Sequence, residues 1–461
     1  RSYALSSLGA AIIALMVLDP SASSSVSFAL SALSTLGIIV FSPLLCSWIP
    51  SVGKRFHALA VEPFSLTFSA LILTFPLSMC TFSQFAIISP FSNIVAVPLV
   101  TVVCALGVLS FLALPIAPIF HLFIQFSYFF AMTLVYVVDA LSAIPFAALP
   151  IDASMELLTL FSVVLCLFLW LAWPRAFPAK TFVCFCIALM LCSFPMRILD
   201  STCTSIVMLD VGQGDSFLIK SRGSTLLIDT GNNPKKLFAG LARHGVNHLD
   251  GIVISHADDD HCGCLADLRG VVSVDSVFVA KGFGSVGTDK AENLLKHAEG
   301  LSSATGVHEL AVDDVITVGS VSFRVISPDG LTDEGENDDS VCLMATTDLN
   351  NDGIGEWRAL FTGDAESEVL DSINEKGALE DIDILKVSHH GAKAALDNEL
   401  MDVLKPEIAL ISAGERNRYG HPAANTISLL ESCNVEVFRT DLQGDVMCIL
   451  NQANISIRTM K

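Results

Sequence analysis

The sequence has 461 residues, of which 52% are hydrophobic and only 16% charged, and its mean hydropathy is +0.62. This composition excludes a disordered chain and argues against a wholly soluble protein. Residues 1–200 hold six basic and six acidic residues, so residues 201–461 carry the whole net charge of −21. We therefore expect a polytopic α-helical membrane domain at residues 1–199 and a soluble domain at residues 204–461. Because the sequence starts at Arg1 rather than at Met, we also expect it to be a fragment.

The first domain contains apolar stretches close to the length of about 20 residues that a helix needs to cross a bilayer. Seven spans are expected, at residues 3–18, 26–49, 58–79, 86–112, 119–143, 155–173 and 180–197. Cytoplasmic loops carry excess Lys and Arg. Such residues follow the second and sixth stretches, and they are Lys54, Arg55, Arg175 and Lys180. Seven spans then predict a multi-pass protein of the cytoplasmic membrane whose soluble domain is extracytoplasmic.

Polar residues inside such stretches are candidates for lining a channel. Glu62, Asn93 and Asp139 stand out for this reason. Residues 85–100 include two prolines, and they favour a discontinuous or re-entrant segment along a water-filled path. The alternative interpretation is that Asn93 caps a helix, whereas Glu62 and Asp139 lie near the membrane interface.

From Ser205 onward, short β-branched runs alternate with helical stretches, which predicts two sheets with outer helices. Strands are expected at residues 205–209, 216–220, 225–228, 251–255, 276–280, 321–326, 359–361, 382–387 and 407–411. Helices are expected at residues 234–244, 289–298, 366–375, 394–404 and 425–431.

Side chains that bind metals gather at the ends of three predicted strands. A histidine and aspartate cluster occupies residues 255–261, a Thr-Gly-Asp motif ends at residue 364, and two adjacent histidines stand at residues 389–390. Because strand ends can project side chains into one pocket, we expect a single metal site. Imidazole and carboxylate together suit zinc, manganese or iron. The candidate ligands are His256, Asp258, Asp260, His261, Asp364 and His389.

The order of these motifs resembles that of the metallo-β-lactamase superfamily. The matching segments are residues 226–231, 255–261, 362–364 and 389–391. More specific segments resemble the ComEC family of competence DNA-uptake channels, and they are residues 91–99, 208–215 and 417–422. The resemblance implies a membrane domain followed by a four-layer αββα sandwich, with a one- or two-metal site between the two sheets.

The sequence departs from the superfamily pattern in its main motif. Most members read His-x-His-x-Asp-His, whereas this chain has Asp258 in place of the second histidine. A further histidine of the superfamily has no clear counterpart, and residues 337–340 read Asn-Asp-Asp-Ser where it is expected. The second metal position is retained. In the resemblance its residues are Asp260, His261, a bridging Asp364 and either His389 or His390.

A divalent ion lowers the pKa of bound water and polarises a phosphoryl oxygen, so we expect hydrolysis of a phosphodiester. Asp260 would orient or deprotonate the water, and His390 or His421 would protonate the leaving oxygen. Oxygen-rich ligands favour manganese, so we expect one or two divalent ions, with manganese at least as effective as zinc. The expected substrate contacts are Asn337, Lys386, Asn417 and Arg418.

The ComEC resemblance implies a channel that takes up single-stranded DNA during natural transformation. The extracytoplasmic domain would then be a metal-dependent nuclease that degrades the strand left outside. Membrane lipid and other DNA-uptake components would be partners, and a homo-oligomer is left open. The net charge of −21 opposes a polyanion and predicts weak intrinsic affinity for DNA.

Two other functions fit the same residues. The first is a membrane-tethered metallohydrolase that acts on a lipid or cell-wall phosphodiester without transport. The second is a DNA channel whose soluble domain only binds a partner, with a degenerate metal site. Replacing His261 or Asp364 would affect transport and hydrolysis differently in the three cases.

Overall fold

The computed structural model describes residues 2–49, 53, 57–172, 203–332 and 335–461. It divides into two compact units, Arg1–Leu189 and Met190–Lys461. Some sequence expectations fall outside the described residues, and they concern the span at 180–197 and the basic residues Lys54, Arg55, Arg175 and Lys180.

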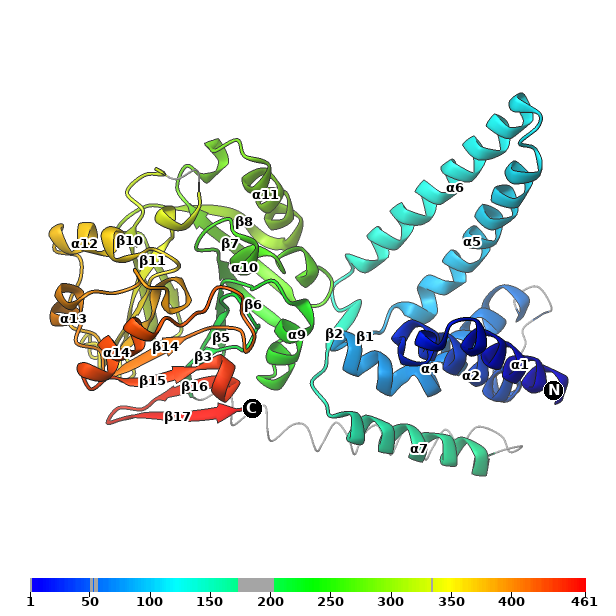
Figure 1. Ribbon diagram of the computed structural model, residues 1–461, viewed down its shortest axis with the longest axis horizontal. Helices are drawn as coiled ribbons and strands as arrows, with labels where there is room; N and C mark the ends of the chain where they lie inside the picture. Colours follow the sequence, from blue (N-terminus) through cyan, green and yellow to red (C-terminus); the bar gives the residue numbers. More distant parts are fainter. Residues whose placement is uncertain (1, 50–52, 54–56, 173–202, 333–334) are drawn as a thin grey trace. The chain divides into compact units, whose positions relative to one another are not determined.

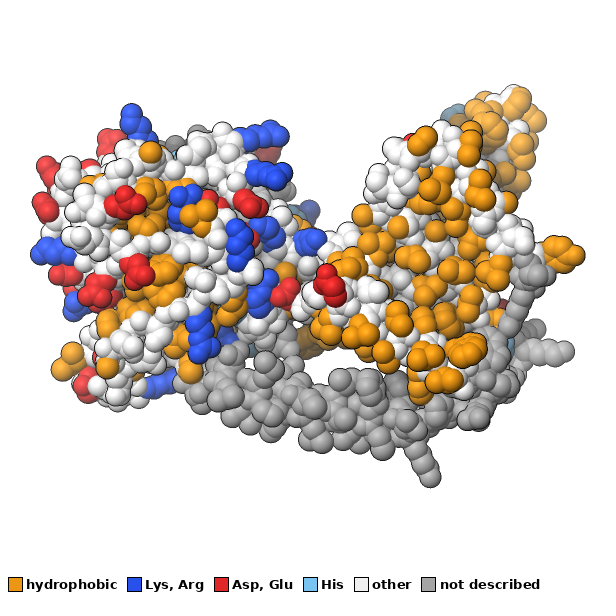
Figure 2. Space-filling model, turned by 60° about the horizontal axis from the view of Figure 1, so that its bottom comes forward, with side chains coloured by type: hydrophobic (Ala, Val, Ile, Leu, Met, Phe, Trp, Pro, Cys, Tyr) orange, Lys and Arg blue, Asp and Glu red, His pale blue; other side chains and the backbone are white. Residues whose placement is uncertain are grey.

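The first unit is built from apolar helices at six of the predicted spans (Figure 1). Their bounds are α1 Ser2–Leu18, α2 Val26–Trp48, α4 Glu62–Phe82, α5 Ser89–Leu112, α6 Ala117–Ser142 and α7 Met155–Ala172. Of these, α2, α4, α5 and α6 are long and apolar enough to cross a membrane, and α1 and α7 are shorter. Figure 2 shows hydrophobic side chains over most of this unit's visible surface, with few charges among them. Such a surface suits lipid rather than water.

Helices α5 and α6 form a hairpin that a two-stranded ribbon closes at its base (Figure 1). The ribbon pairs β1 Gln84–Ala86 with β2 Ala148–Pro150 in antiparallel register. The break in the sequence therefore precedes α5, and Pro90 lies in the first helical turn, where a missing N–H costs little. The expectation of a discontinuous segment at residues 85–100 is wrong, because α5 continues through Pro98.

The second unit contains two sheets of eight and seven strands. The strand order of the first is β17-β16-β3-β4-β5-β6-β7-β8. Their bounds are β3 Thr204–Met208, β4 Phe217–Ser221, β5 Ser224–Ile228, β6 His248–Val253, β7 Ser273–Ala280, β8 Ser302–Leu310, β16 Asp445–Leu450 and β17 Ile455–Met460. The order of the second is β15-β14-β13-β12-β11-β10-β9. Their bounds are β9 Val315–Val318, β10 Val321–Ser327, β11 Cys342–Thr347, β12 Trp357–Phe361, β13 Ile384–Lys386, β14 Ile408–Ile411 and β15 Glu436–Arg439.

The two sheets pack face to face, and helices cover their outer faces (Figure 1). Apolar side chains of both sheets form the central core, in which the rings of Phe217 and Phe361 lie 5.5 Å apart. The main helices of the unit are α9 Pro234–Arg243, α11 Asp289–Leu301, α12 Ser367–Glu375, α13 Asn398–Leu404 and α14 Ala424–Ser432. Leu370, Leu400 and Leu430 from α12, α13 and α14 pack in a separate core on the second sheet. The predicted αββα sandwich is confirmed.

Candidate metal centre

Parallel strands of both sheets place the candidate ligands at their carboxyl ends. In the first sheet β5, β6 and β7 run parallel, and in the second β12, β13 and β14 do so. Asp229 follows β5 directly, and His256 follows β6 after two residues. Asp364 follows β12 after two residues, and His390 follows β13 after three. The carboxyl ends of parallel strands meet at one edge of a sheet, so residues distant in sequence come together.

Three histidines are oriented by hydrogen bonds at Nδ1. The Nδ1 atom of His261 lies 2.9 Å from Asp229 Oδ2, and that of His390 lies 3.0 Å from the carbonyl oxygen of Ser412. The Nδ1 atom of His256 lies 3.0 Å from Ser255 Oγ. In the described part of the chain, Nε2 of His256 and of His261 is buried and makes no hydrogen bond. With Nδ1 engaged, each ring turns Nε2 inward as a possible metal ligand, as metal-binding histidines do.

The free nitrogen atoms converge on two carboxylates. His261 Nε2 lies 3.2 Å from Asp364 Oδ2, and His390 Nε2 lies 3.5 Å from the same oxygen. His390 Nε2 also lies 3.2 Å from Asp260 Oδ2. The donor atoms of His256, His261 and Asp364 lie within 4.8 Å of one another, and so do those of Asp260, His261 and His390. Buried imidazole nitrogens beside carboxylate oxygens fit a divalent ion.

The buried charges change the pKa values of the three histidines. Burial lowers the pKa of His390, but the Asp364 and Asp215 carboxylates outweigh burial and raise it to about 10. Burial also opposes the charged form of His261, yet Asp364 and Asp229 raise its pKa well above the ordinary value. Burial and the charge of His261 lower the pKa of His256 to about 4. Protons and divalent ions compete for these nitrogen atoms, so metal binding would depend on pH.

Two predicted ligands lie beside the cluster rather than in it. Asp258 Oδ1 accepts from Lys290 Nζ at 2.7 Å. His389 Nδ1 lies 2.8 Å from Glu366 Oε1, and its Nε2 is 4.0 Å from Asp364 Oδ2. His390, which the sequence offered both as a proton donor and as an alternative ligand to His389, is only 1% exposed and lies among the candidate ligands. Of the two adjacent histidines, the structure thus brings His390 into the cluster and leaves His389 beside it.

The structure corrects the expected role of Lys386. The sequence analysis expected Lys386 to contact the substrate, but the residue is 2% exposed. Its ammonium pairs with Asp215 and lies 3.3 Å from Asp364 Oδ1. A side chain enclosed in this way cannot reach a substrate from solution.

The other expected substrate contacts lie in two loops. Asn417 Nδ2 donates to the carbonyl oxygens of Gly414 and His421 at 2.9 and 2.6 Å, so its amide organises the loop that carries His421. Arg418 is exposed in the same loop. The Asn337 side-chain oxygen is buried and, among the described residues, accepts no hydrogen bond. The His421 ring lies 5.5 Å from that of His389.

Sequence reasoning missed two buried carboxylates, Asp215 and Asp229. The Asp229 carboxylate accepts from the Ser255 backbone N–H at 2.8 Å and orients His261. Asp215 is fully buried and pairs with Lys386 and with His390. Both residues lie in the segments that resemble known families. Asp215 precedes β4, and Asp229 directly follows β5. An aspartate directly after a strand of buried apolar residues was the signal for Asp229.

Two glycines allow the loops to approach closely at this site. Gly214 has φ +130°, and a Cβ there would lie 2.2 Å from the backbone oxygen of Asp260. Gly363 has φ +53°, and a Cβ there would lie 2.7 Å from Ser340 Cβ. Both positions exclude other residues on steric grounds. The loop that carries Asp215 can therefore pass against the loop that carries Asp260.

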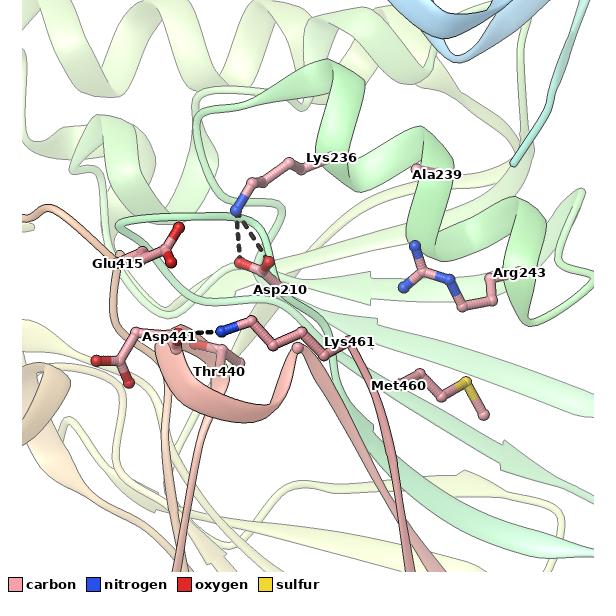
Figure 3. Close-up of a pocket in the computed structure, with 10 residues that line it drawn as sticks. Asp210, Lys236, Ala239, Arg243, Glu415, Thr440, Asp441, Met460 and Lys461 are labelled. Atoms are coloured by element: carbon pink, nitrogen blue, oxygen red, sulfur yellow. Dashed lines mark hydrogen bonds and ion pairs between the residues drawn. The ribbon is translucent and has the colours of Figure 1, made fainter. Parts of the chain in front are cut away.

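A pocket of about 240 Å³ in the second unit lies apart from these ligands (Figure 3). Two of its lysines contact other lining residues: Lys236 Nζ lies 2.7 Å from Asp210 Oδ1, and Lys461 Nζ donates to the Asp441 carbonyl oxygen at 3.3 Å. None of the candidate metal ligands lines it. We therefore place the functional site at the histidine cluster.

The candidate channel residues lie in the first unit. Glu62 is the first residue of α4, half exposed and 3.4 Å from His57 Nδ1. Asp139 lies in the last turn of α6 and is exposed. Asn93 is neither a cap nor in a broken segment, since α5 begins at Ser89. Its Nδ2 donates to Thr67 Oγ1 of α4 at 3.0 Å.

Each of the two units contains a segment that matches a known protein family. The Competence protein family matches residues 1–177, and the metallo-beta-lactamase superfamily matches residues 209–339. ComE operon protein 3 of Bacillus subtilis (strain 168) is 31% identical over 259 residues, which cover 52% of this chain and 32% of that protein. Recombination protein 2 of Haemophilus influenzae is 26% identical over 267 residues, which cover 54% of this chain and 29% of that protein.

A third relative is competence protein ComA of Neisseria gonorrhoeae, with 25% identity over 261 residues that cover 56% of this chain and 34% of that protein. The chain thus spans about a third of the length of the curated relatives it matches. Among solved structures, the metallo-beta-lactamase fold protein YhfI of Bacillus subtilis has a TM-score of 0.31 and 13% identity, covering 51% of this chain and 96% of that one.

Fold, site and family matches define a membrane protein that carries a metallo-β-lactamase-like domain. The chain is similar to competence proteins, since residues 1–177 match the Competence protein family and its relatives include ComE operon protein 3 and competence protein ComA.

Proposed function

We propose that the second unit is a metal-dependent phosphodiesterase that cleaves DNA, and that the first unit forms part of a channel for single-stranded DNA. The observation that carries the proposal is the cluster at the strand ends, where Nε2 of His261 and of His390 faces Asp364. The cluster lies in a metallo-β-lactamase-like unit of a chain whose other part matches the Competence protein family. A hydrolase joined to such a membrane unit would act on a polymer that is being transported across the membrane.

The residues of the cluster divide the chemistry among them. His256, His261, His390, Asp260 and Asp364 would hold one or two divalent ions, which supply an activated water and polarise a phosphoryl oxygen. Burial would raise the pKa of Asp260, but the hydrogen bond with His390 and the charge of His261 lower it. Asp260 therefore stays ionised and can accept a hydrogen bond from the attacking water.

His421 would protonate the leaving oxygen in this proposal. It is half-buried, and its Nδ1 makes no hydrogen bond within the described residues. Burial and the nearby His389 and His390 lower its pKa, so the ring is mostly neutral at pH 7 and would have to take up a proton before it could donate one. His390 is no longer proposed as a proton donor, because its Nε2 lies among the candidate metal ligands.

The loop before α14 supplies the surface that DNA would contact. Arg416, Arg418 and Tyr419 are exposed there, and the Tyr419 ring lies 5.9 Å from that of His421. An aromatic ring beside arginines suits single-stranded nucleic acid, because bases stack on the ring while the cations meet phosphates. With a net charge of −21 on the whole chain, this loop would have to offset a generally repulsive surface.

The second unit would lie outside the cytoplasmic membrane, as the seven expected spans imply. Membrane lipid and other DNA-uptake components would be its partners, and assembly into a homo-oligomer is open. A membrane-impermeant thiol reagent on intact cells should then label a cysteine placed at Asn350 and miss one placed at Lys54. The reverse labelling would show the opposite orientation.

The experiment compares Asp364→Asn and His261→Ala with Asp352→Asn, an exposed control in the turn between β11 and β12. We expect the first two variants to lose DNA degradation and DNA uptake by cells, and the control to keep both. Normal uptake with lost hydrolysis of a lipid or cell-wall substrate would support the tethered hydrolase instead. Full function of both variants would support a domain that only binds a partner.

A further inference from the structure

Asp364 divides its two oxygens between different partners. Oδ2 faces the histidines, with His261 Nε2 at 3.2 Å and His390 Nε2 at 3.5 Å. Oδ1 faces Lys386, whose Nζ lies 3.3 Å away. Only Oδ2 is therefore available to an ion on the histidine side of the carboxylate.

The ammonium of Lys386 has a complete set of acceptors. It contacts the carboxylates of Asp215 and Asp364 and the backbone oxygen of Gly363. A lysine ammonium has three donors, so these three acceptors satisfy it without water. Lys386 ends β13 of one sheet, whereas Asp215 precedes β4 of the other. The lysine thus joins the two sheets beneath the histidine cluster.

The same acidic groups form one of the places where an ion fits by distance alone. Donor atoms of Asp215, Asp364 and His390 lie within 4.8 Å of one another. A divalent ion there would share two carboxylates with the ammonium of Lys386, and the two positive charges would repel each other strongly in a buried environment. On the other side of Asp364, the neighbours of Oδ2 are imidazole nitrogens of His261 and His390, which can exchange their protons for a divalent ion.

We propose that Lys386 takes the place of a second cation in this centre, so that the site binds a single divalent ion on the side of His256 and His261. The inference rests on the metal site of the proposed function but not on DNA as its substrate. Lys386 acts as a positioning residue, because it fixes Asp364 so that one oxygen points to the ion.

The test is the number of Mn²⁺ ions bound per purified 461-residue chain, measured by equilibrium dialysis with elemental analysis. We expect one ion in the wild-type protein and a six-line electron paramagnetic resonance spectrum without coupling between two ions. Lys386→Met should bind two ions, since the vacated carboxylates would accept the second. Lys386→Arg, which keeps the charge, should bind one, as should Lys376→Met, an exposed control that also removes one positive charge.

Two ions in the wild-type protein would overturn the inference and leave the metal site itself intact. No ion in the wild-type protein would overturn both. If Lys386→Met does not fold, the wild-type number and Lys386→Arg still decide the question, because a second ion in either one contradicts the role of the lysine.

Discussion

At the residue scale, the adjacent residues His389 and His390 occupy different environments at this site. His389 and His390 both have positive φ, at +43° and +53°, which is rare outside glycine and is found mostly at functional sites. The turn buries His390 among the ligands and leaves His389 partly exposed beside Glu366. Two adjacent histidines are visible in the sequence, but which of them points inward depends on backbone angles that the letters do not encode.

Asp445 provides a test of buried charge away from the metal centre. Its carboxylate accepts from the Asp210 backbone N–H at 2.8 Å, lies 3.1 Å from His244 Nε2 and pairs with Arg243. Burial raises its pKa, but His244, the Asp210 N–H and Arg243 lower it below the ordinary 3.8. Asp445→Asn keeps the shape and removes the charge, so it should destabilise the second unit by about 2 kcal/mol at pH 7.

The effect of Asp445→Asn should depend on pH in a defined direction. Because the folded-state pKa is depressed, the carboxylate stabilises the protein above about pH 3.8 and loses this contribution as pH falls through the folded pKa. Thermal unfolding should therefore separate wild type and variant at pH 7, and the gap should close only as pH falls below the folded-state pKa, which itself lies under 3.8. Asp313→Asn, an exposed control, should change little at either pH. An equal gap at both pH values would contradict this assignment.

At the element scale, the sequence predicted strands with strong local signals and missed those that depend on distant partners. Strand β16 pairs with β3 from the other end of the unit, and nothing local marks this pairing. Strand β13 illustrates the limit for the site. Its three residues, Ile384–Lys386, are all buried because helices and the other sheet cover both faces. Alternation therefore carries no information there, although a lysine within an apolar run was a signal of a buried ion pair.

The contact between α4 and α5 is the basis of a prediction for the membrane unit. We propose that Asn93 faces a path for DNA while its amide donates to Thr67. Asn93→Leu removes an interhelical hydrogen bond worth about 0.6 kcal/mol. Asn93→Asp places a carboxylate in the membrane at a cost of up to about 3 kcal/mol and repels a polyanion. DNA entry into cells should fall more for Asp than for Leu.

Thr101→Val on the exposed side of α5 is the matched control and should leave entry unchanged. DNA hydrolysis by the second unit should be the same in all three variants. Normal entry with Asn93→Asp would remove the channel role of this residue.

At the scale of the whole molecule, the chain separates its tasks by composition. The first 200 residues are neutral and apolar, and the remainder carries the whole net charge of −21. This division was readable from the sequence, as were the αββα sandwich and most of the side chains that gather in the candidate metal centre. The buried ion pair between Lys386 and Asp215 could not be predicted from the sequence. The two residues are 171 positions apart along the chain and meet only when the two sheets pack. A strongly acidic chain with a metal centre predicts weak DNA binding that metal strengthens.

Metal-dependent DNA cleavage by the purified 461-residue chain tests the central claim most directly. The protein is stripped of metal, reconstituted with Mn²⁺ or Zn²⁺, and mixed with labelled single- and double-stranded DNA. We predict cleavage that requires a divalent ion, at least as fast with Mn²⁺ as with Zn²⁺. Asp364→Asn should lower the rate by roughly 100-fold or more. No cleavage with either ion, or equal cleavage by wild type and Asp364→Asn, would contradict the account.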